Sequence, residues 1–440
     1  MKTTVTVQSI IDGGKLSALQ WLVFVLGCLI ILADGLDAGA IGYIAPSVME
    51  EWGIDKKDLG PVLSAALIGM SLGALGSGPL ADRFGRRWVV IATTFLFGVA
   101  TLLSATSQNL GHLEIWRFLT GLGLGAAMPN IATLLAEYMP KKRRMLMVNM
   151  MLCMFPLGAS LGGVLSAVLL KHFGWHAILV IGGVLPIALT VVLLFALPES
   201  VPFLLRQGRQ DAARKIIAKL GRPLTDSEEL TLADDSGKVQ QASAEKPLKM
   251  LLSSTYLKSG ITMWLCCFMS LLVFYLLMSW MPTILKNAGF GVEQYSLLTA
   301  VFPFGGVVGT LIIGWFMDRF NPNRALMTTY FISAALLLVT GLFGSNIYLL
   351  GGFIFLAGAG LVGAQSSLPS LAAASYPVQC RAAGVSWMHG IGRLGAITGA
   401  LFGSVIFAFG LDIQGIFMLL AAPVLVSALA LWAKGTETVD

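Results

Sequence analysis

The chain has 440 residues, of which 56% are hydrophobic and only 12% are charged. A water-soluble domain carries about 25% charged residues, so this sequence has too little polar surface to cover a globule that faces water. The formal net charge is +6, but the basic residues lie between apolar runs, and this distribution does not indicate a nucleic-acid-binding surface.

The apolar residues are gathered in runs of about 20, the length at which a helix crosses the hydrocarbon core of a bilayer. Strands of a membrane barrel would be about 10 residues long and would alternate polar and apolar residues. These runs are apolar throughout. The sequence therefore predicts an all-α polytopic membrane protein with twelve transmembrane helices, near residues 19–46, 60–80, 88–107, 112–138, 146–170, 176–197, 258–282, 294–317, 325–344, 347–374, 382–408 and 412–434.

Basic residues occur in every second loop between these helices. Cationic loops stay on the cytoplasmic side of a membrane, and the helix count is even. We therefore expect both termini to face the cytoplasm, in a multi-pass protein of the cell inner (plasma) membrane. The basic residues concerned are Arg83, Arg86 and Arg87, then 141–144, then Arg206, Arg209 and Arg214, then Arg319 and Arg324, and finally Arg381.

The longest polar stretch, residues 199–257, predicts a cytoplasmic linker between an N-terminal six-helix bundle at 1–198 and a C-terminal one at 258–440. Within the linker, residues 209–220 have helical spacing with apolar residues on one face. This helix could lie along the membrane surface or be a solvated linker helix. The five cysteines show no metal-ligand spacing, and we expect neither a metal nor another cofactor.

The two halves resemble each other when the chain is shifted by 236 residues. Pro46 then falls on Pro282, and Asp82-Arg83-Phe84 falls on Asp318-Arg319-Phe320. At a shift of 237, Gly158 falls on Gly395. Two parallel copies can rock about a site between them, near the membrane midplane. This arrangement is typical of a transporter, whereas a channel would more usually show subunit symmetry around a pore.

The few ionisable residues inside the predicted helices are functional candidates, because each costs roughly 2.5–3.5 kcal/mol to insert. Asp34 and Asp37 are three residues apart and lie on one face of the first helix. Two like charges in a cavity of low dielectric constant cannot both ionise cheaply. The pair is therefore a candidate proton carrier. The alternative is that the two acids only satisfy polar neighbours.

Arg393 lies near the middle of the predicted helix 382–408, without a route for its side chain to water. It needs an anion, either an acidic side chain or a substrate carboxylate that its guanidinium can bind in bidentate fashion. His389 lies one turn away and could relay protons or simply pack. Arg117 is a further candidate for substrate contact, or for packing against backbone carbonyls or the first helix.

Several aromatic side chains accompany these charges and could stack on a ring-bearing substrate. We name Tyr43 and Trp387 as candidates for substrate binding, with Phe155, Phe274 and Tyr275 as further possibilities. Most aromatic residues in a membrane protein face lipid or pack in the core, so this choice is the least specific one.

The loop at 78–87 (GPLADRFGRR) lies at the cytoplasmic ends of two predicted helices. The carboxylate of Asp82 can meet a helix N-terminus, where negative charge is favoured, and the arginines can reach Glu137. Such a network would hold the cytoplasmic side shut and break on opening. Basic loops occur in any membrane protein, but the repeated Asp-Arg supports a specific role. The predicted gate residues are Asp82, Arg83, Arg86, Glu137, Asp318 and Arg381.

The motif Gly-x-x-x-Asp-Arg-x-Gly-Arg-Arg at 78–87 resembles the signature loop of the major facilitator superfamily, with a degraded copy at 314–324. Residues 117–125 and 198–200 are also similar to motifs of that superfamily. Asp34-Gly-Leu-Asp37, residues 42–46 and Gly392-Arg393-Leu-Gly395 resemble the aromatic acid:proton symporter family.

The resemblance implies the major facilitator fold and proton-driven uptake of aromatic carboxylates such as benzoate, hydroxybenzoates, protocatechuate or hydroxyphenylpropionates. It also implies importance for Asp34, Asp37, Asp82, Arg86, Arg117, Glu137 and Arg393. Residues 198–202 are similar to a sugar-porter motif too, except that Pro202 stands where those proteins have arginine.

We therefore expect a transporter rather than an enzyme: a monomer embedded in membrane lipid, with a small organic anion and protons as its partners. The open alternatives are a symporter of another organic acid or a sugar, and a drug exporter. A dicarboxylate site would need a second cationic residue in the cavity. A site for a lipophilic cation would favour acidic residues, so the central Arg393 argues against a drug exporter. A membrane enzyme is a weak option, because the predicted helices hold no nucleophile–base pair.

Overall fold

The computed structural model describes residues 3–13, 16–221, 228–231, 250–251, 253–343 and 346–435. Within these ranges, twelve helical spans are long and apolar enough to cross a membrane, as the sequence predicted. The first six spans are formed by α2 (Ala18–Trp52), α3 (Gly60–Phe84), α4 (Arg86–Ser104), α5 (Leu110–Tyr138), α6 (Lys141–Leu152) together with α7 (Met154–Phe173), and α8 (Trp175–Ala196). The other six are α12 (Ser254–Asn287), α13 (Val292–Arg319), α14 (Pro322–Thr340), α15 (Ile347–Ser375), α16 (Val378–Ala408) and α17 (Ile413–Lys434).

The first helix is longer than predicted, because α2 continues through Pro46 to Trp52. Proline is tolerated inside a membrane helix when neighbouring groups compensate the freed backbone. The helix stops at Gly53, whose φ of 62° is a left-handed conformation that favours glycine. The equivalent helix α12 likewise contains Pro282 and is followed by Gly289 with φ 94°. The two helices therefore end in the same way.

The same close helix contacts occur in both halves. A Cβ atom at Gly69 would overlap the carbonyl oxygen of Phe118, and one at Gly305 would overlap the carbonyl oxygen of Phe355. These pairs are equivalent at the shifts found in the sequence. Small residues let helix backbones approach closely in lipid. The structure thus gives the internal repeat a physical basis, since the matching glycines sit at matching backbone contacts.

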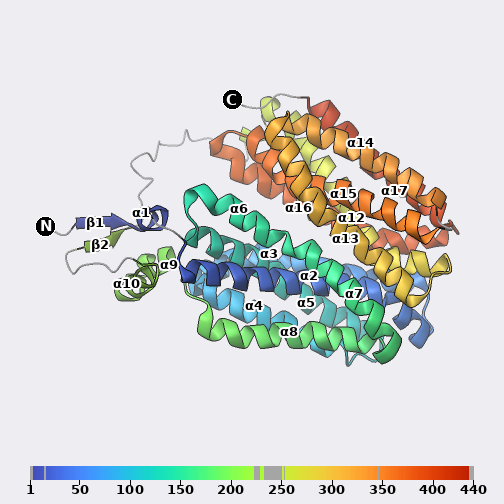
Figure 1. The fold of residues 1–440 in the computed structure, drawn as a ribbon, viewed down its shortest axis with the longest axis horizontal. Helices are drawn as coiled ribbons and strands as arrows, with labels where there is room; N and C mark the ends of the chain where they lie inside the picture. The colour runs from blue at the N-terminus through green and yellow to red at the C-terminus, as the bar shows by residue number, and fades with distance from the viewer. Residues whose placement is uncertain are drawn as a thin grey trace.

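The two sets of helices lie side by side, with α2 to α8 in the lower part of Figure 1 and α12 to α17 in the upper part. Within the described residues, their most extensive contacts are those of α2 with α12, α3 with α16, and α7 with α13. Asp34 and Asp37 lie on α2, and Arg393 lies on α16. The residues predicted to handle protons and substrate are therefore carried by helices of this interface.

The end of the bundle that carries the N-terminal segment and the loops around Arg86 and 141–144, here called the basic end, lies at the left of Figure 1. There β1 (Thr3–Thr6) pairs in parallel with β2 (Glu228–Thr231), beside α1 (Val7–Asp12), α9 (Val201–Arg206) and α10 (Gln210–Lys219). Apart from β2, residues 222–249 of the predicted linker lie outside the described residues.

The apolar face of helix α10 packs against the rest of the protein. Ala213 and Ile217 are fully buried and belong to the same hydrophobic cluster as Leu204 and Tyr138. Neither expectation for residues 209–220 matches this arrangement, because the apolar face meets protein rather than lipid or solvent. The periodicity was correct, but the sequence could not show that a partner surface lies nearby.

The repeated glycine contacts lead to a stability prediction. Replacing Gly305 by leucine would force a side chain into the backbone of α15, and overpacking of this kind costs about 1–3 kcal/mol or more. Gly314 lies on the same helix, and a Cβ there meets no atom within 4 Å. We expect Gly305→Leu to lower the thermal unfolding midpoint of the purified protein, while Gly314→Leu leaves it near the wild-type value. Equal effects of the two changes would contradict this packing.

Candidate functional site

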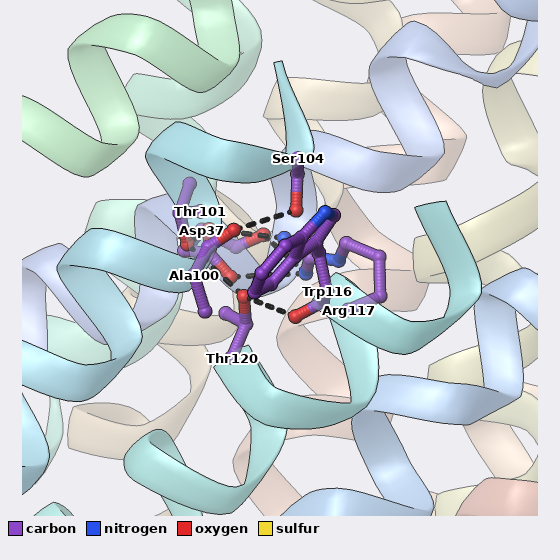
Figure 2. A network of polar contacts seen from close by, with 7 residues as sticks. All are labelled: Asp37, Ala100, Thr101, Ser104, Trp116, Arg117 and Thr120. Carbon is purple, nitrogen blue, oxygen red and sulfur yellow. Dashed lines mark hydrogen bonds and ion pairs between the residues drawn. The ribbon is translucent and has the colours of Figure 1, made fainter. Parts of the chain in front are cut away.

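A completely buried ion pair lies within the first set of helices (Figure 2). Asp37 of α2 accepts hydrogen bonds from both terminal nitrogens of Arg117 on α5, at 3.1 Å for Nη1 and 2.9 Å for Nη2. The hydroxyl of Thr101 on α4 donates to the same carboxylate at 2.8 Å. Both charged side chains are 0% exposed. Three helices are thereby tied together around one carboxylate.

This arrangement decides how Arg117 is used in the conformation described. Its guanidinium faces an acidic side chain of the first helix, which is the alternative to substrate contact that the sequence left open. A buried pair of this kind is matched in charge, and removing one member leaves an uncompensated charge at a cost of about 3–5 kcal/mol. The geometry gives Arg117 an internal partner and no exposed surface for a substrate anion.

Asp34 has a different environment, although it lies only three residues before Asp37. Its side chain is 1% exposed, and neither carboxylate oxygen has a hydrogen-bond partner among the described residues. The groups near enough to act on it include Asp37, and Arg393 of α16 across the interface. A buried carboxyl group without partners is far less costly when it is neutral. The geometry is therefore that of a group that can gain and lose a proton.

Arg393 reaches across the interface between the two sets of helices. Its Nη1 atom donates to the backbone carbonyl of Met70 on α3 at 2.9 Å and approaches that of Ser71 at 3.5 Å. The side chain of Tyr275 on α12 lies within electrostatic range of both Asp34 and Arg393. A guanidinium has five N–H donors, and both of these hydrogen bonds come from Nη1. The remaining donors can bind an anion.

His389 lies one turn before Arg393 on α16, toward the basic end, and its side chain is exposed. Arg393 itself is partly buried. The face of α16 that carries both residues thus becomes more accessible toward the basic end.

The two aromatic candidates occupy different surroundings. Tyr43 is 1% exposed, and its hydroxyl donates to the carbonyl of Ala159 on α7 at 3.1 Å, so it serves helix packing. Trp387 is 47% exposed and lies 6.0 Å from Trp264 between ring centroids. No contact among the described residues brings Tyr43 or Trp387 next to Asp34, whereas the charges of Asp34 and Arg393 both act on Tyr275. Tyr275 is therefore the better aromatic candidate.

At the basic end, Arg86 forms an ion pair with Glu137 of α5. The carboxylate at the N-terminus of α4 comes from Glu199, which accepts a hydrogen bond from the backbone N–H of Arg87 at 3.1 Å. The expectation that Asp82 occupies this position is wrong, because Asp82 is exposed. Gly85 has φ 92°, and a Cβ there would collide with Glu199. The glycine thus makes room for the carboxylate.

The second copy of this loop is arranged differently. Asp318 and Arg381 are exposed, and Arg319 lies over the ring of Trp315 at 4.6 Å. The side chain of Asn321 accepts from the backbone N–H of Arg324 and caps α14. Among the described residues of the basic end, no ion pair joins the two sets of helices. Arg83 is also exposed and lies over Phe84.

Comparison with known proteins places the chain in a family. The profile of the Major Facilitator Superfamily matches residues 27–291 and 263–439. The 4-hydroxybenzoate transporter PcaK of Pseudomonas aeruginosa is 44% identical over 98% of this chain and 95% of its own length. The gallate transporter of Pseudomonas putida is 41% identical over the same shares. The benzoate transport protein of Acinetobacter baylyi is 32% identical over 91% of this chain and 86% of its own length.

The chain belongs to the Major Facilitator Superfamily, and within it to the aromatic acid transporters. It is accordingly a multi-pass integral membrane protein. The crystal structure of a D-xylose-proton symporter has the same fold, with a TM-score of 0.72 at 16% identity over 95% of this chain and 99% of that chain. The inward-open xylose transporter XylE of E. coli matches with a TM-score of 0.73 at 16% identity, over 94% and 96%.

Two residues of this transporter were not found as site residues from the sequence. Thr101 supplies a hydrogen bond to Asp37, but threonines in membrane helices commonly bond to their own backbone and carry no distinguishing signal. Glu199 belongs to the motif Pro198-Glu199-Ser200, which was recognised without a role. Its carboxylate also accepts from the N–H of Ser200, and its backbone carbonyl accepts from the hydroxyl of Tyr138.

The second half of the transporter suggests a test of the Asp37–Arg117 pair. At the corresponding positions it carries Val273 and Ile354, both buried. We expect Arg117→Ile alone to destabilise the protein by about 3–5 kcal/mol, because it leaves Asp37 uncompensated. The double change Asp37→Val with Arg117→Ile should recover most of that stability. Thermal unfolding of the purified variants measures both effects, and a double variant as unstable as the single one would contradict charge matching.

Proposed function

We propose that this transporter takes up an aromatic carboxylate together with protons by alternating access across the cell inner membrane, as a monomer with both termini in the cytoplasm. The observation that carries the proposal is the buried, unpartnered Asp34 within reach of Arg393, at the interface of the two sets of helices. The relatives named as transporters of 4-hydroxybenzoate, gallate and benzoate support the substrate class.

In the proposed cycle, Asp34 and the substrate compete for one guanidinium. Ionised Asp34 pairs with Arg393 and leaves no free cation for a substrate. A proton on Asp34 releases Arg393, which then binds the carboxylate through its fork of donors. Tyr275 lies within electrostatic range of both groups, and in this cycle it contacts the aromatic ring or its substituents. Substrate binding thus requires the proton, and this requirement couples the two fluxes.

Asp37 and Arg117 have a supporting role in this proposal. Arg117 is engaged by Asp37. The guanidinium of Arg393 uses only Nη1 in its described hydrogen bonds, and its other donors would bind the substrate. A single fixed cation suits a monocarboxylate better than a dicarboxylate, and it disfavours a lipophilic cation. The alternative that remains closest is symport of another organic acid or a sugar.

The gate and the moving parts are also proposals. Residues 1–198 and 258–440 would rock as two units joined by the linker 199–257, and the packing of α10 on the first unit means that part of the linker would move with it. The pair Arg86–Glu137 and the capping carboxylate of Glu199 would stabilise the basic end of the first unit. Asp82, Arg83, Asp318 and Arg381 are exposed. Arg381 donates to the carbonyl of Tyr376 and Arg83 lies over Phe84, and these four residues would exchange such contacts for others in another conformation.

The role of Asp34 predicts a separation between two kinds of transport. An asparagine amide resembles a permanently neutral acid, so Asp34→Asn should still exchange labelled for unlabelled benzoate across a liposome membrane. It should lose accumulation driven by a pH gradient, because no proton is carried. Asp211→Asn, a change of an exposed acid on α10, is the matched control. Undiminished accumulation in Asp34→Asn would remove the coupling role.

The role of Arg393 predicts a loss of affinity that charge alone does not repair. Lysine retains the positive charge but lacks the planar fork that binds a carboxylate through two hydrogen bonds. We expect Arg393→Lys to weaken benzoate binding about tenfold, which corresponds to roughly 1.4 kcal/mol. Binding of aromatic and aliphatic acids to purified wild-type protein and variant, at two pH values, measures this. Preference for aliphatic acids in the wild type would contradict the substrate class.

A further inference from the structure

A cleft of about 520 Å³ lies at the end of the molecule opposite to the basic end, here called the far end. It is formed by α2, α12, α16 and η1 (Lys56–Leu59), and so lies between the two sets of helices. Its walls include the apolar side chains of Met49, Ile54 and Phe407. None of these residues takes part in the proposed site around Asp34.

The cleft contains an ion pair that joins the two repeats. Lys286 of α12 donates to Glu50 of α2 at 2.6 Å and approaches the carbonyl of Pro46 at 3.3 Å. Positions 50 and 286 are equivalent at the shift of 236, so the pair lies where the two copies meet. The side chains of Lys286 and Glu50 are 36% and 76% exposed. An exposed ion pair is worth about 0–1 kcal/mol, so another carboxylate can replace Glu50.

The cleft also has an excess of positive charge. Three of its lining residues are lysines and two are acids. Lys57 is close to Asp55 at 3.4 Å, and Lys286 is paired with Glu50. Lys56 instead lies over the ring of Phe407, 4.9 Å from its centroid, and thereby also reaches from the first set of helices to the second. Within the described part of the chain, the cleft thus combines a lysine that has no acidic partner of its own with an aromatic wall.

A buried polar group faces the same cleft. Thr283 lines it and is only 1% exposed, and its hydroxyl has no hydrogen-bond partner among the residues that the structure describes. An unsatisfied buried hydroxyl costs about 1–3 kcal/mol. If this hydroxyl turns toward the cleft, a ligand oxygen there satisfies it. This is an observation independent of the lysines, and it points to an acceptor-bearing ligand.

We propose that the far-end cleft is a second binding site for the aromatic carboxylate, in which the carboxylate replaces Glu50 on Lys286 and the ring lies against Phe407. Thr283 donates to the bound carboxylate, and Lys56 adds the positive charge that attracts it. The chemical class of the ligand rests on the proposed function. Occupation of the site breaks the Lys286–Glu50 contact, so a substrate that arrives at the far end weakens the closure of that end.

The far end offers a matched control for this proposal. Lys171 of α7 lies 3.9 Å from Glu293 of α13, in another ion pair between the two sets of helices. Lys171 does not line the cleft. A change at Lys171 therefore weakens closure of the same end without touching the proposed site.

The test uses the full-length protein in lipid nanodiscs and the fluorine NMR signal of 4-fluorobenzoate. In an Arg393→Ala background, in which the central site is disabled, we expect line broadening from the cleft. Adding Lys286→Gln or Lys56→Gln should weaken this binding about three- to fivefold, as expected for loss of an exposed charge interaction, while Lys171→Gln leaves it unchanged. The proposal would be overturned if the Lys286 and Lys56 variants broadened the 4-fluorobenzoate signal as much as the background protein does. It would also be overturned if uncharged 4-fluorobenzamide were broadened equally.

A transport measurement with Arg393 intact keeps the proposal testable if the Arg393→Ala protein does not fold. Lys286→Gln and Thr283→Val should raise the KM for benzoate uptake several-fold with little change in the maximal rate, and Lys171→Gln should not. If the wild type transports benzoate and the Lys286→Gln and Thr283→Val variants have the same KM, the cleft site is refuted and the proposed function stands. A wild-type protein that neither binds nor transports aromatic carboxylates would refute the proposed function.

Discussion

A charged side chain inside the membrane needs an oppositely charged partner. Asp37 and Arg117 satisfy this requirement for each other through two hydrogen bonds. Both groups are fully buried, so neither can be relieved by water. The pair holds α2 against α5, and Thr101 adds α4 to the same contact. The position of α2 is therefore set by an electrostatic match in addition to glycine packing. Because Asp34 lies on this helix, the pair also fixes where the proposed proton site faces the second set of helices.

The two halves keep the same packing but differ in their buried charges. The close contact of Gly158 with Leu32 in the first half is repeated by Gly395 with Phe268 in the second. The network of Asp37 and Arg117 is replaced there by the buried apolar pair Val273 and Ile354. Close packing is what both halves need to move as units. In the proposed cycle, these polar differences give the site its proton carrier and its anion-binding group.

The sequence was sufficient for features that depend on length and repetition. Runs of apolar residues predicted the spans, and the matched glycines and Asp-Arg-Phe motifs predicted the repeat. It was insufficient where rotation of a helix decides the contact. Residues three apart on a helix are separated by about 60° around its axis. This difference turns Asp37 toward Arg117, while Asp34 has no hydrogen-bond partner in the described part of the chain. Similarly, both Asp82 and Glu199 could have capped α4, and only the folded chain shows that Glu199 does.

In the proposed cycle, Arg393 connects proton binding, anion binding and the contact between the two halves. Its Nη1 atom binds the backbone of α3 across the interface, while its charge acts on Asp34. A substrate carboxylate that engages the same guanidinium would alter its contact with α3 and its interaction with the acid at once. Proton binding, anion binding and contact between the two halves would then share one side chain. A coupling mechanism built in this way needs no long-range signal, because the groups that must exchange partners are already neighbours.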